Sequence, residues 1–244
     1  MKKKVALVIG GNGGIGSSIV ERLLSDGFFV CTTFFQNKDQ IERIQNEQDN
    51  FKAYQCDVND SDIVKNVIDS IITEFNVIDI VVFSVASNYK NNLILNLNWD
   101  EISDHFNLQI KSMFLVIQAM SEQIKLKYKT KFIVILSEVC KGQPPNGFSA
   151  YVTSKYAAMG MAKTMALELA RYNCRVNMVS PGLVETNLLS EIPKKMIEIA
   201  AINNPLKQNT LASDVAKTVS FLASKDADFL NGANIPVNGG NVLF

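Results

Sequence analysis

Short apolar runs alternate with amphipathic stretches along the whole sequence, and this alternation leaves few architectures open to the chain. The apolar runs have the length of strands and are apolar at consecutive positions, which is typical of strands buried on both faces. Between them, apolar residues recur at helical spacing, most clearly over residues 61–75. The predicted strands cover residues 4–9, 28–34, 51–56, 77–83, 131–136, 175–179 and 235–237. The predicted helices cover 15–24, 61–75, 150–171 and 213–223, and 99–128 holds one long or two successive helices.

Strands that alternate with helices in this way form a parallel sheet covered on both faces. Right-handed crossovers then give an α/β doubly wound fold of the Rossmann type, with ligand sites at the carboxyl ends of the strands. We therefore predict a single domain over residues 1–244 with a central parallel sheet of about seven strands. Residues 183–211 fit the alternation least. They contain Pro193 and Pro205, and their length suits a mobile lid over a substrate pocket.

Charge and hydropathy exclude several classes of partner. The 24 basic residues balance 24 acidic ones, so no net positive charge indicates binding to nucleic acid or to an anionic membrane. No apolar stretch approaches the roughly 20 residues that span a bilayer. The N-terminus lacks the longer apolar region and the cleavage site of a signal peptide. We expect a cytoplasmic protein with no nucleic-acid or membrane partner.

Cysteine and histidine usage limits the chemistry. The four cysteines lie far apart without a Cys-x-x-Cys pair, so we expect reduced thiols, no disulfide scaffold and no metal site. His105 is the only histidine, which leaves almost no material for a serine–histidine hydrolase or a histidine metal cluster.

A glycine-rich loop joins the first predicted strand to the first predicted helix. Glycines permit a tight turn and let a pyrophosphate approach the backbone, and the helix that follows points free N–H groups at the anion. A flexible turn is the simpler interpretation of glycines alone, but the position between a strand and a helix favours a dinucleotide site. The predicted cofactor contacts in this loop are Gly10, Asn12, Gly13, Gly14, Ile15 and Gly16.

The end of the second strand bears on the choice between NAD and NADP. An acidic residue there would bond the ribose hydroxyls of NAD and repel the 2′-phosphate of NADP. The sequence has Phe34 at this tip, and Thr33, Gln36, Asn37 or Lys38 could bond a 2′-phosphate. NADP(H) is therefore favoured over NAD(H). The alternative is that these polar residues simply face water.

Tyr151 and Lys155 lie four residues apart at the start of a predicted helix, so both side chains share one helical face. An ammonium group beside a phenol stabilises the phenolate and lowers the phenol pKa from about 10. Such a tyrosine can donate a proton to a carbonyl oxygen or take one from an alcohol. Alone, this pair is a weak signal, because the spacing arises by chance on many helices.

Together with the glycine loop, the pair makes the whole chain resemble the short-chain dehydrogenases/reductases, and most closely the β-ketoacyl (3-oxoacyl) reductases of fatty acid or polyketide biosynthesis. Gly10, Gly14 and Gly16 match the family's Gly-x-x-x-Gly-x-Gly loop, and Tyr151 and Lys155 match its catalytic pair. Further matches cover the segments 177–186, 203–206, 214–216 and 231–240. The resemblance implies additional cofactor contacts from Phe34, Asp57, Val58, Ala86, Pro181, Gly182, Val184 and Thr186.

The sequence departs from the family pattern at several positions. Ile9 stands where a threonine commonly steadies the glycine loop, and residues 83–86 replace the usual Asn-Asn-Ala-Gly. The position of the supporting helix asparagine falls on Gln109, with Asn107 two residues out of register.

The catalytic serine of the family precedes the tyrosine by 13 residues, which is Glu138 here, with Ser137 one step earlier. Either a one-residue insertion lets Ser137 serve, or Glu138 faces the substrate, in which case a neutral, protonated carboxyl could donate the hydrogen bond. Adjacent strand residues point to opposite faces, so the two are not expected to share one role. A third alternative has Glu138 turned to solvent and Ser137 as a plain strand-end serine.

The resemblance implies an NADPH-dependent reduction of a ketone to a secondary alcohol, with a small-molecule or carrier-protein-bound 3-oxoacyl thioester as substrate. In it Tyr151 protonates the oxygen, Lys155 holds the ribose, and Ser137 or Glu138 orients the substrate. A sugar or secondary alcohol dehydrogenase is an alternative, as is a catalytically silent partner subunit, which the residues Gln109 and Glu138 motivate. The helix 150–171 and the long one before it are expected to form a two-fold interface in a homodimer, a homotetramer or a hetero-oligomer.

Overall fold

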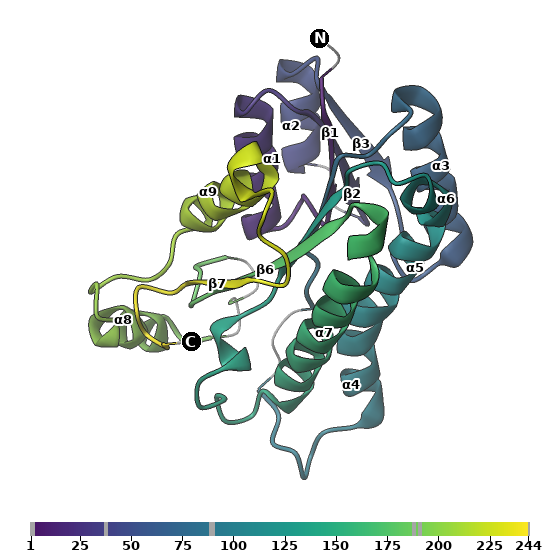
Figure 1. Cartoon of the computed structure of the whole chain (residues 1–244). Helices are drawn as coiled ribbons and strands as arrows, with labels where there is room; N and C mark the ends of the chain where they lie inside the picture. The colour runs from purple at the N-terminus through teal and green to yellow at the C-terminus, as the bar shows by residue number, and fades with distance from the viewer. Residues whose placement is uncertain (1–2, 37–38, 88–90, 187–188, 190–191, 244) are drawn as a thin grey trace.

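The computed structural model describes residues 3–36, 39–87, 91–186, 189 and 192–243. Within them the chain forms a seven-stranded sheet whose paired strands all run parallel, in the order β3-β2-β1-β4-β5-β6-β7 (Figure 1). The strands are β1 (Val5–Ile9), β2 (Phe29–Phe34), β3 (Phe51–Gln55), β4 (Ile80–Phe83), β5 (Lys131–Ile135), β6 (Arg175–Pro181) and β7 (Asn234–Val237). The predicted doubly wound α/β fold with about seven strands is confirmed.

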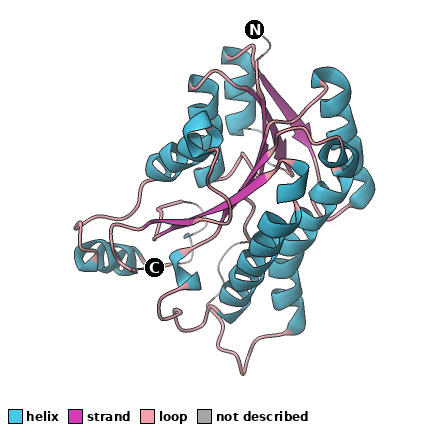
Figure 2. Ribbon diagram, viewed as in Figure 1, coloured by secondary structure: helices cyan, strands magenta, loops and turns pink. Residues whose placement is uncertain are grey.

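Helices cover both faces of the sheet (Figure 2). They are α1 (Gly14–Ser25), α2 (Asp39–Glu47), α3 (Ser61–Phe75), α4 (Trp99–Phe106), α5 (Ser112–Ala119), α6 (Ser121–Lys125), α7 (Ser149–Glu168), α8 (Lys194–Asn203) and α9 (Ala212–Ala223). The predicted long helix over 99–128 is a succession of α4, a π-helical turn η1 (Asn107–Lys111), α5 and α6. Two helices, α2 and α8, lie where the sequence predicted none.

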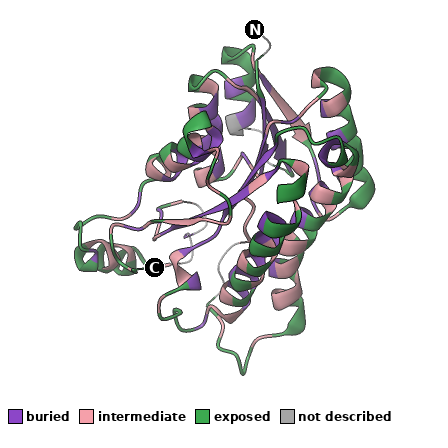
Figure 3. Cartoon of the chain, in the orientation of Figure 1, coloured by how far each residue is buried: buried purple, intermediate pink, exposed green. Residues whose placement is uncertain are grey.

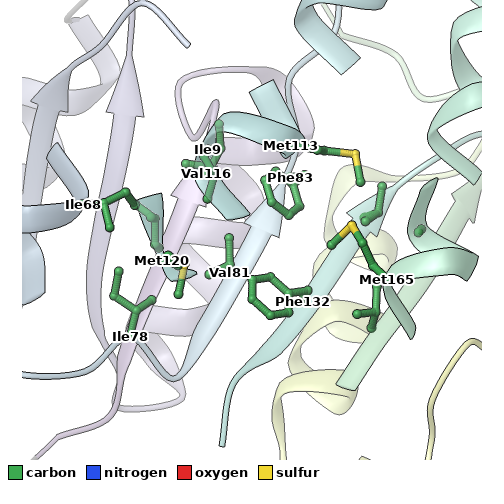
Figure 4. Packing of buried hydrophobic residues seen from close by; sticks show 14 of the residues in the cluster. Ile9, Ile68, Ile78, Val81, Phe83, Met113, Val116, Met120, Phe132 and Met165 are labelled. Atoms are coloured by element: carbon green, nitrogen blue, oxygen red, sulfur yellow. The ribbon is translucent and has the colours of Figure 1, made fainter. Parts of the chain in front are cut away.

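Strand residues alternate between two cores, one on each face of the sheet. Leu7 packs with α3, α5 and α7, whereas its neighbour Val8 packs with α1, α2 and α9. Figure 4 shows the first core, in which Phe83 and Phe132 meet Met113 and other apolar side chains of the covering helices. The strands β1, β2, β4, β5 and β6 are buried, the edge strands β3 and β7 are mostly half-buried, and the outer faces of the helices are exposed (Figure 3). This two-sided burial explains why the strands read as continuous apolar runs.

The strand order creates the position for a ligand. The chain adds β2 and β3 on one side of β1 and then places β4 on the other side. The loops after β1 and β4 therefore diverge, which opens a crevice at the carboxyl end of the sheet. In the described part of the chain, no helix is both long and apolar enough to cross a membrane.

Candidate active site

A cavity of about 1240 Å³ lies at the carboxyl ends of β1, β4, β5 and β6. Most of the residues predicted as site residues line it: Asn12, Gly13, Gly14, Ile15, Gly16, Ala86, Ser137, Glu138, Tyr151, Lys155, Pro181, Gly182, Val184 and Thr186. Phe34, Asp57 and Val58 are outside this lining, at the ends of β2 and β3. Asn37 and Lys38 lie outside the described residues. No cluster of three metal-binding side chains occurs in the part of the chain that the structure covers.

The glycine loop leaves no room for a side chain at Gly10, Gly14 or Gly16. Gly10 has a φ of +83°, and a Cβ at Gly16 would lie 2.1 Å from the Gly10 carbonyl oxygen. A Cβ at Gly14 would lie 2.5 Å from Cγ2 of Thr186. Gly13 begins α1 without a side-chain cap, so the first N–H groups of this helix face the cavity side uncapped. The loop therefore has the shape and the donors of a phosphate cradle.

Thr33 supports this loop from below. Its hydroxyl Oγ1 accepts a hydrogen bond from the Gly10 N–H at 3.1 Å, and its side chain is buried. This contact supplies from β2 the support that Ile9 does not give. It also removes Thr33 from the residues that could bond a 2′-phosphate, because its hydroxyl lies beneath the loop. The sequence could not reveal this exchange, since it depends on the pairing of β1 with β2.

Lys155 is the most deeply held charged group of the cavity, with 2% of its surface exposed. Its Nζ donates to the Ile135 carbonyl at 2.9 Å and to Oε1 of Gln109 at 3.1 Å. The amide of Gln109 in turn donates to the Val85 carbonyl at 2.6 Å. Burial lowers the pKa of Lys155 to about 8, and the nearby Cys140 opposes the shift.

Of the two residues considered as the support of Lys155, Gln109 makes the contact and Asn107 does not. Gln109 lies in the π-helical turn η1 and contacts Lys155, although it does not line the cavity, whereas Asn107 is exposed. A π-helical turn inserts one residue relative to an α-helix and so changes the face on which a side chain lies. The sequence places the family position on Gln109, and it is the Gln109 side chain that contacts Lys155.

Tyr151 lies beside Lys155 on the first turns of α7, with 6% of its surface exposed. The Lys155 Nζ is 5.7 Å from the centre of the tyrosine ring. The His105 ring meets the Tyr151 ring edge-on at a centroid distance of 6.1 Å. The sequence analysis missed His105 as a neighbour of the site, because the contact arises from the packing of α4 against α7.

Ser137 and Glu138 both line the cavity, which contradicts the expectation that adjacent residues face opposite sides. The alternation of a strand does not apply here, because β5 ends at Ile135 and a 3₁₀ turn, η2 (Glu138–Cys140), begins directly after Ser137. The hydroxyl of Ser137 accepts a hydrogen bond from the Val139 N–H at 3.4 Å, which leaves its own proton to donate.

Glu138 is half-buried rather than turned to solvent. Its Oε1 accepts a hydrogen bond from the Asn241 side chain at 3.0 Å. Burial raises the pKa of the Glu138 carboxyl, and the side-chain amides of Asn241 and Asn238 oppose this rise.

One part of the cavity lining is an apolar wall. It comes from the loop after β5 and from the segment around α8, and it consists of Val139, Pro145, Phe148, Leu189, Ile192, Pro193, Met196 and Ala200. Helix α8 buries no residue of its own, so it stands away from the two cores. This arrangement is compatible with the predicted lid over 183–211, which stays a prediction.

Known proteins are similar to this chain in sequence and in fold over nearly their whole length. Residues 10–241 match the family model described as enoyl-(acyl carrier protein) reductase. The chain is 31% identical over 242 residues to the 3-oxoacyl-(acyl-carrier-protein) reductase FabG of Staphylococcus epidermidis, covering 97% of this chain and 98% of that relative. It is 29% identical to tropinone reductase-like 3 of Erythroxylum coca, covering 97% and 92% of the two chains.

Two solved structures superpose on the chain over 98% of both partners. The 3-ketoacyl-(acyl-carrier-protein) reductase of Brucella melitensis complexed with NADH has a TM-score of 0.88 at 23% identity, a likeness of fold. ElxO with NADP bound has a TM-score of 0.88 at 26% identity.

Proposed function

The chain belongs to the short-chain dehydrogenase/reductase family and is therefore an oxidoreductase, and from this premise we propose that it reduces a 3-oxoacyl thioester to the 3-hydroxyacyl thioester with NADPH. The observation that carries the proposal is the convergence of Ser137, Tyr151 and Lys155 on one cavity whose far end is the glycine loop. That cavity joins proton donors to a dinucleotide cradle, which is the combination a carbonyl reduction needs.

The residues present fit a dinucleotide. A pyrophosphate can approach the backbone of the glycine loop, because Gly10, Gly14 and Gly16 carry no side chains. Thr186 lies against this loop, and Lys155 lines the same cavity, where its ammonium group would hold a ribose hydroxyl of the cofactor. When bound there, NADPH would supply the hydride for the carbonyl carbon.

The chain's own residues supply the proton and the orientation. Tyr151 donates its hydroxyl proton to the carbonyl oxygen, and Ser137 donates a hydrogen bond that orients this oxygen. Lys155 stabilises the tyrosinate that remains after the proton has left. Gln109 and the Ile135 carbonyl hold the ammonium group in place for this role.

Gln109 supports an active enzyme over a silent partner subunit. The departures from the family pattern at Gln109 and Glu138 together motivate the silent-subunit hypothesis. The Gln109 side chain nevertheless bridges Lys155 to the Val85 carbonyl with two hydrogen bonds, so the lysine remains fixed. The support that the family takes from its asparagine is therefore available here from a glutamine.

The preference for NADPH is supported by the end of β2. The strand ends in Phe34, and the next described residues, Phe35 and Gln36, are exposed and uncharged. A 2′-phosphate would meet no carboxylate there. We expect NADPH to bind at least as well as NADH, and Phe34→Asp to shift the preference toward NADH. The test is a titration of the protein with each reduced cofactor, in which the cofactor's fluorescence reports binding. A clear preference of the wild type for NADH would refute the prediction.

The substrate is inferred from the apolar wall and from the relatives' names. Apolar side chains of the α8 segment can bury an acyl chain, because such a chain has no polar groups that need hydrogen-bond partners. A carrier protein that bears the acyl group is then the expected macromolecular partner.

Two assays on the purified chain test this proposal. One follows the oxidation of NADPH with acetoacetyl-N-acetylcysteamine as the thioester, and the other follows the reduction of NADP with cyclohexanol as a secondary alcohol. We expect turnover of the thioester at an ordinary enzymatic rate. Turnover of the alcohol alone would favour an alcohol dehydrogenase, and turnover of neither would favour the silent subunit.

A further inference from the structure

The C-terminal turn, residues 238–242, contacts the loop that carries Ser137. It follows β7 directly, and the Asn241 side chain donates to Oε1 of Glu138 at 3.0 Å. A second contact lies beside the first, because the backbone of Gly142 packs against Val242, whose Cγ2 would be 2.8 Å from a Cβ at residue 142. We propose that Glu138 and Asn241 are positioning residues that hold the 3₁₀ turn η2, and through it the hydroxyl of Ser137, in the geometry needed to orient the substrate oxygen. This inference rests on the proposed role of Ser137.

Hydrogen bonds join Ser137 to the turn η2, so that the two move together. The Ser137 hydroxyl accepts from the Val139 N–H, and the Ser137 carbonyl accepts from the Cys140 N–H at 3.2 Å. The Glu138 carbonyl accepts from the N–H groups of Lys141 and Gly142. A rotation of this turn therefore moves the serine hydroxyl with it. On the strand side, Leu136 is fixed to Val179 of β6 by a backbone hydrogen bond of 2.8 Å. The Glu138 side chain is the anchor at the other end.

The C-terminal turn, to which Glu138 is bonded, is itself firmly held. Asn238 is buried, and its amide donates to the Val242 carbonyl at 2.8 Å while its side-chain oxygen accepts from the Gly240 N–H at 3.1 Å. The Asn238 carbonyl accepts from the Asn241 N–H at 3.1 Å and from the Asn204 amide at 2.9 Å. Asn204 follows the last residue of α8. The C-terminal turn thus links the serine loop to the base of the segment that forms the apolar wall.

The burial of the Glu138 carboxyl indicates a role beyond stability. Its second oxygen, Oε2, is buried and has no hydrogen-bond partner within the described residues. Leaving a buried carboxylate oxygen unpaired costs free energy, so such groups call for a functional explanation. A neutral apolar residue at this position would avoid that cost but would give Asn241 nothing to bond. Glu138 therefore serves the contact with the turn at the expense of stability.

The test exchanges donor and acceptor across this contact. Asn241→Asp places two carboxylates together, and we expect kcat to fall about tenfold with the NADPH dissociation constant unchanged, because repulsion turns the serine loop away. Adding Glu138→Gln to Asn241→Asp restores one donor and one acceptor, and we expect most of the lost kcat to return. The matched control is Asn66→Asp on the exposed face of α3, which makes the same charge change away from the site.

The decisive arm repeats Asn241→Asp in a Ser137→Ala background. If Glu138 and Asn241 act through the serine hydroxyl, the second change adds almost nothing once that hydroxyl is gone. A full tenfold loss in both backgrounds, or no rescue by the exchanged pair, would overturn the inference. Wild-type kcat in Ser137→Ala alone would instead contradict the role proposed for Ser137, and the inference would fall with it. Should Asn241→Asp not fold, Asn241→Ala in both backgrounds gives the same comparison.

Discussion

Among the single residues, Lys155 matters most to the proposed mechanism, because its buried ammonium group is held by neutral hydrogen-bond acceptors. Lys155 meets only carbonyl and amide oxygens among its described hydrogen-bond partners, and burial lowers its pKa to about 8. The protonated form is the one that stabilises a tyrosinate. Because the folded-state pKa lies below the ordinary value for lysine, the ammonium form is present at lower pH and is lost as the pH rises through about 8.

Gln109→Met should move this titration. The variant keeps the size of the side chain but removes the oxygen that accepts from Nζ, which disfavours the ammonium form and lowers the pKa of Lys155 further. We expect the fall of kcat/KM with rising pH to shift to lower pH. The pH profile measures it, with Gln118→Met on the exposed side of α5 as the control. An unchanged profile would separate Gln109 from the ionisation of Lys155.

Ser137→Ala tests the oxygen-orienting hydroxyl. Deleting one such donor removes roughly 2–4 kcal/mol of transition-state stabilisation, so kcat should fall by about 30- to 900-fold. NADPH affinity should stay at the wild-type value, because the hydroxyl acts on the substrate oxygen. Steady-state kinetics and cofactor titration measure both, and Ser70→Ala on α3 is the matched serine control. A kcat within threefold of wild type would be incompatible with the role assigned to Ser137.

The residues of the site were predictable to different degrees. Tyr151 and Lys155 could be predicted because their chemistry follows from spacing on one helix. The support of the glycine loop by Thr33, the edge contact of His105 and the hydrogen bond of Glu138 to Asn241 could not. Each joins residues far apart in sequence, and no local pattern records such a contact.

At the element scale, burial decides which parts of the fold the sequence predicts. The strands were found because two covered faces make them continuously apolar. Helix α2 was missed because only Ile41 and Ile44 reach the core, and α8 because it buries no residue at all. The π-helical turn η1 was missed because its one inserted residue leaves the apolar pattern of the flanking helices almost intact.

The entry to α1 carries a prediction of its own. Gly16→Ala would place a Cβ 2.1 Å from the Gly10 carbonyl oxygen, a backbone atom that cannot move without the loop. We expect a loss of about 1–3 kcal/mol in the free energy of unfolding and a clear weakening of NADPH binding. Gly160→Ala on α7 meets no atom within 4 Å and should instead stabilise the chain by about 0.5–1 kcal/mol. Urea unfolding and cofactor titration compare the two, and equal effects would contradict the tight packing of the loop.

At the scale of the whole molecule, apolar side chains remain on the outer faces of α5 and α7. Phe114, Tyr156 and Leu167 are 50%, 42% and 81% exposed. An exposed apolar surface of this kind is typical of a protein–protein interface. The predicted association through these helices stays a prediction, and a dimer or tetramer would cover the three side chains.

Light scattering on the purified chain tests the association. We expect a mass that is two or four times the 27.0 kDa of one chain. Tyr156→Glu and Leu167→Glu together should reduce it, because two charges cannot be buried unpaired in an apolar interface. A wild-type mass near 27.0 kDa at working concentration would contradict the oligomer.

Tyr151→Phe separates proton transfer from cofactor binding. In the proposed mechanism Tyr151 gives the proton, while other residues of the cavity bind the cofactor. The variant keeps the aromatic ring, which contacts His105 and Lys155, and removes only the hydroxyl. Single-turnover reduction of acetoacetyl-N-acetylcysteamine and fluorescence titration of NADPH are measured on the same preparation. We predict that the rate falls by about 10²–10⁴-fold while the NADPH dissociation constant stays within about twofold of wild type. A single-turnover rate near that of the wild type, with NADPH bound, would contradict the account.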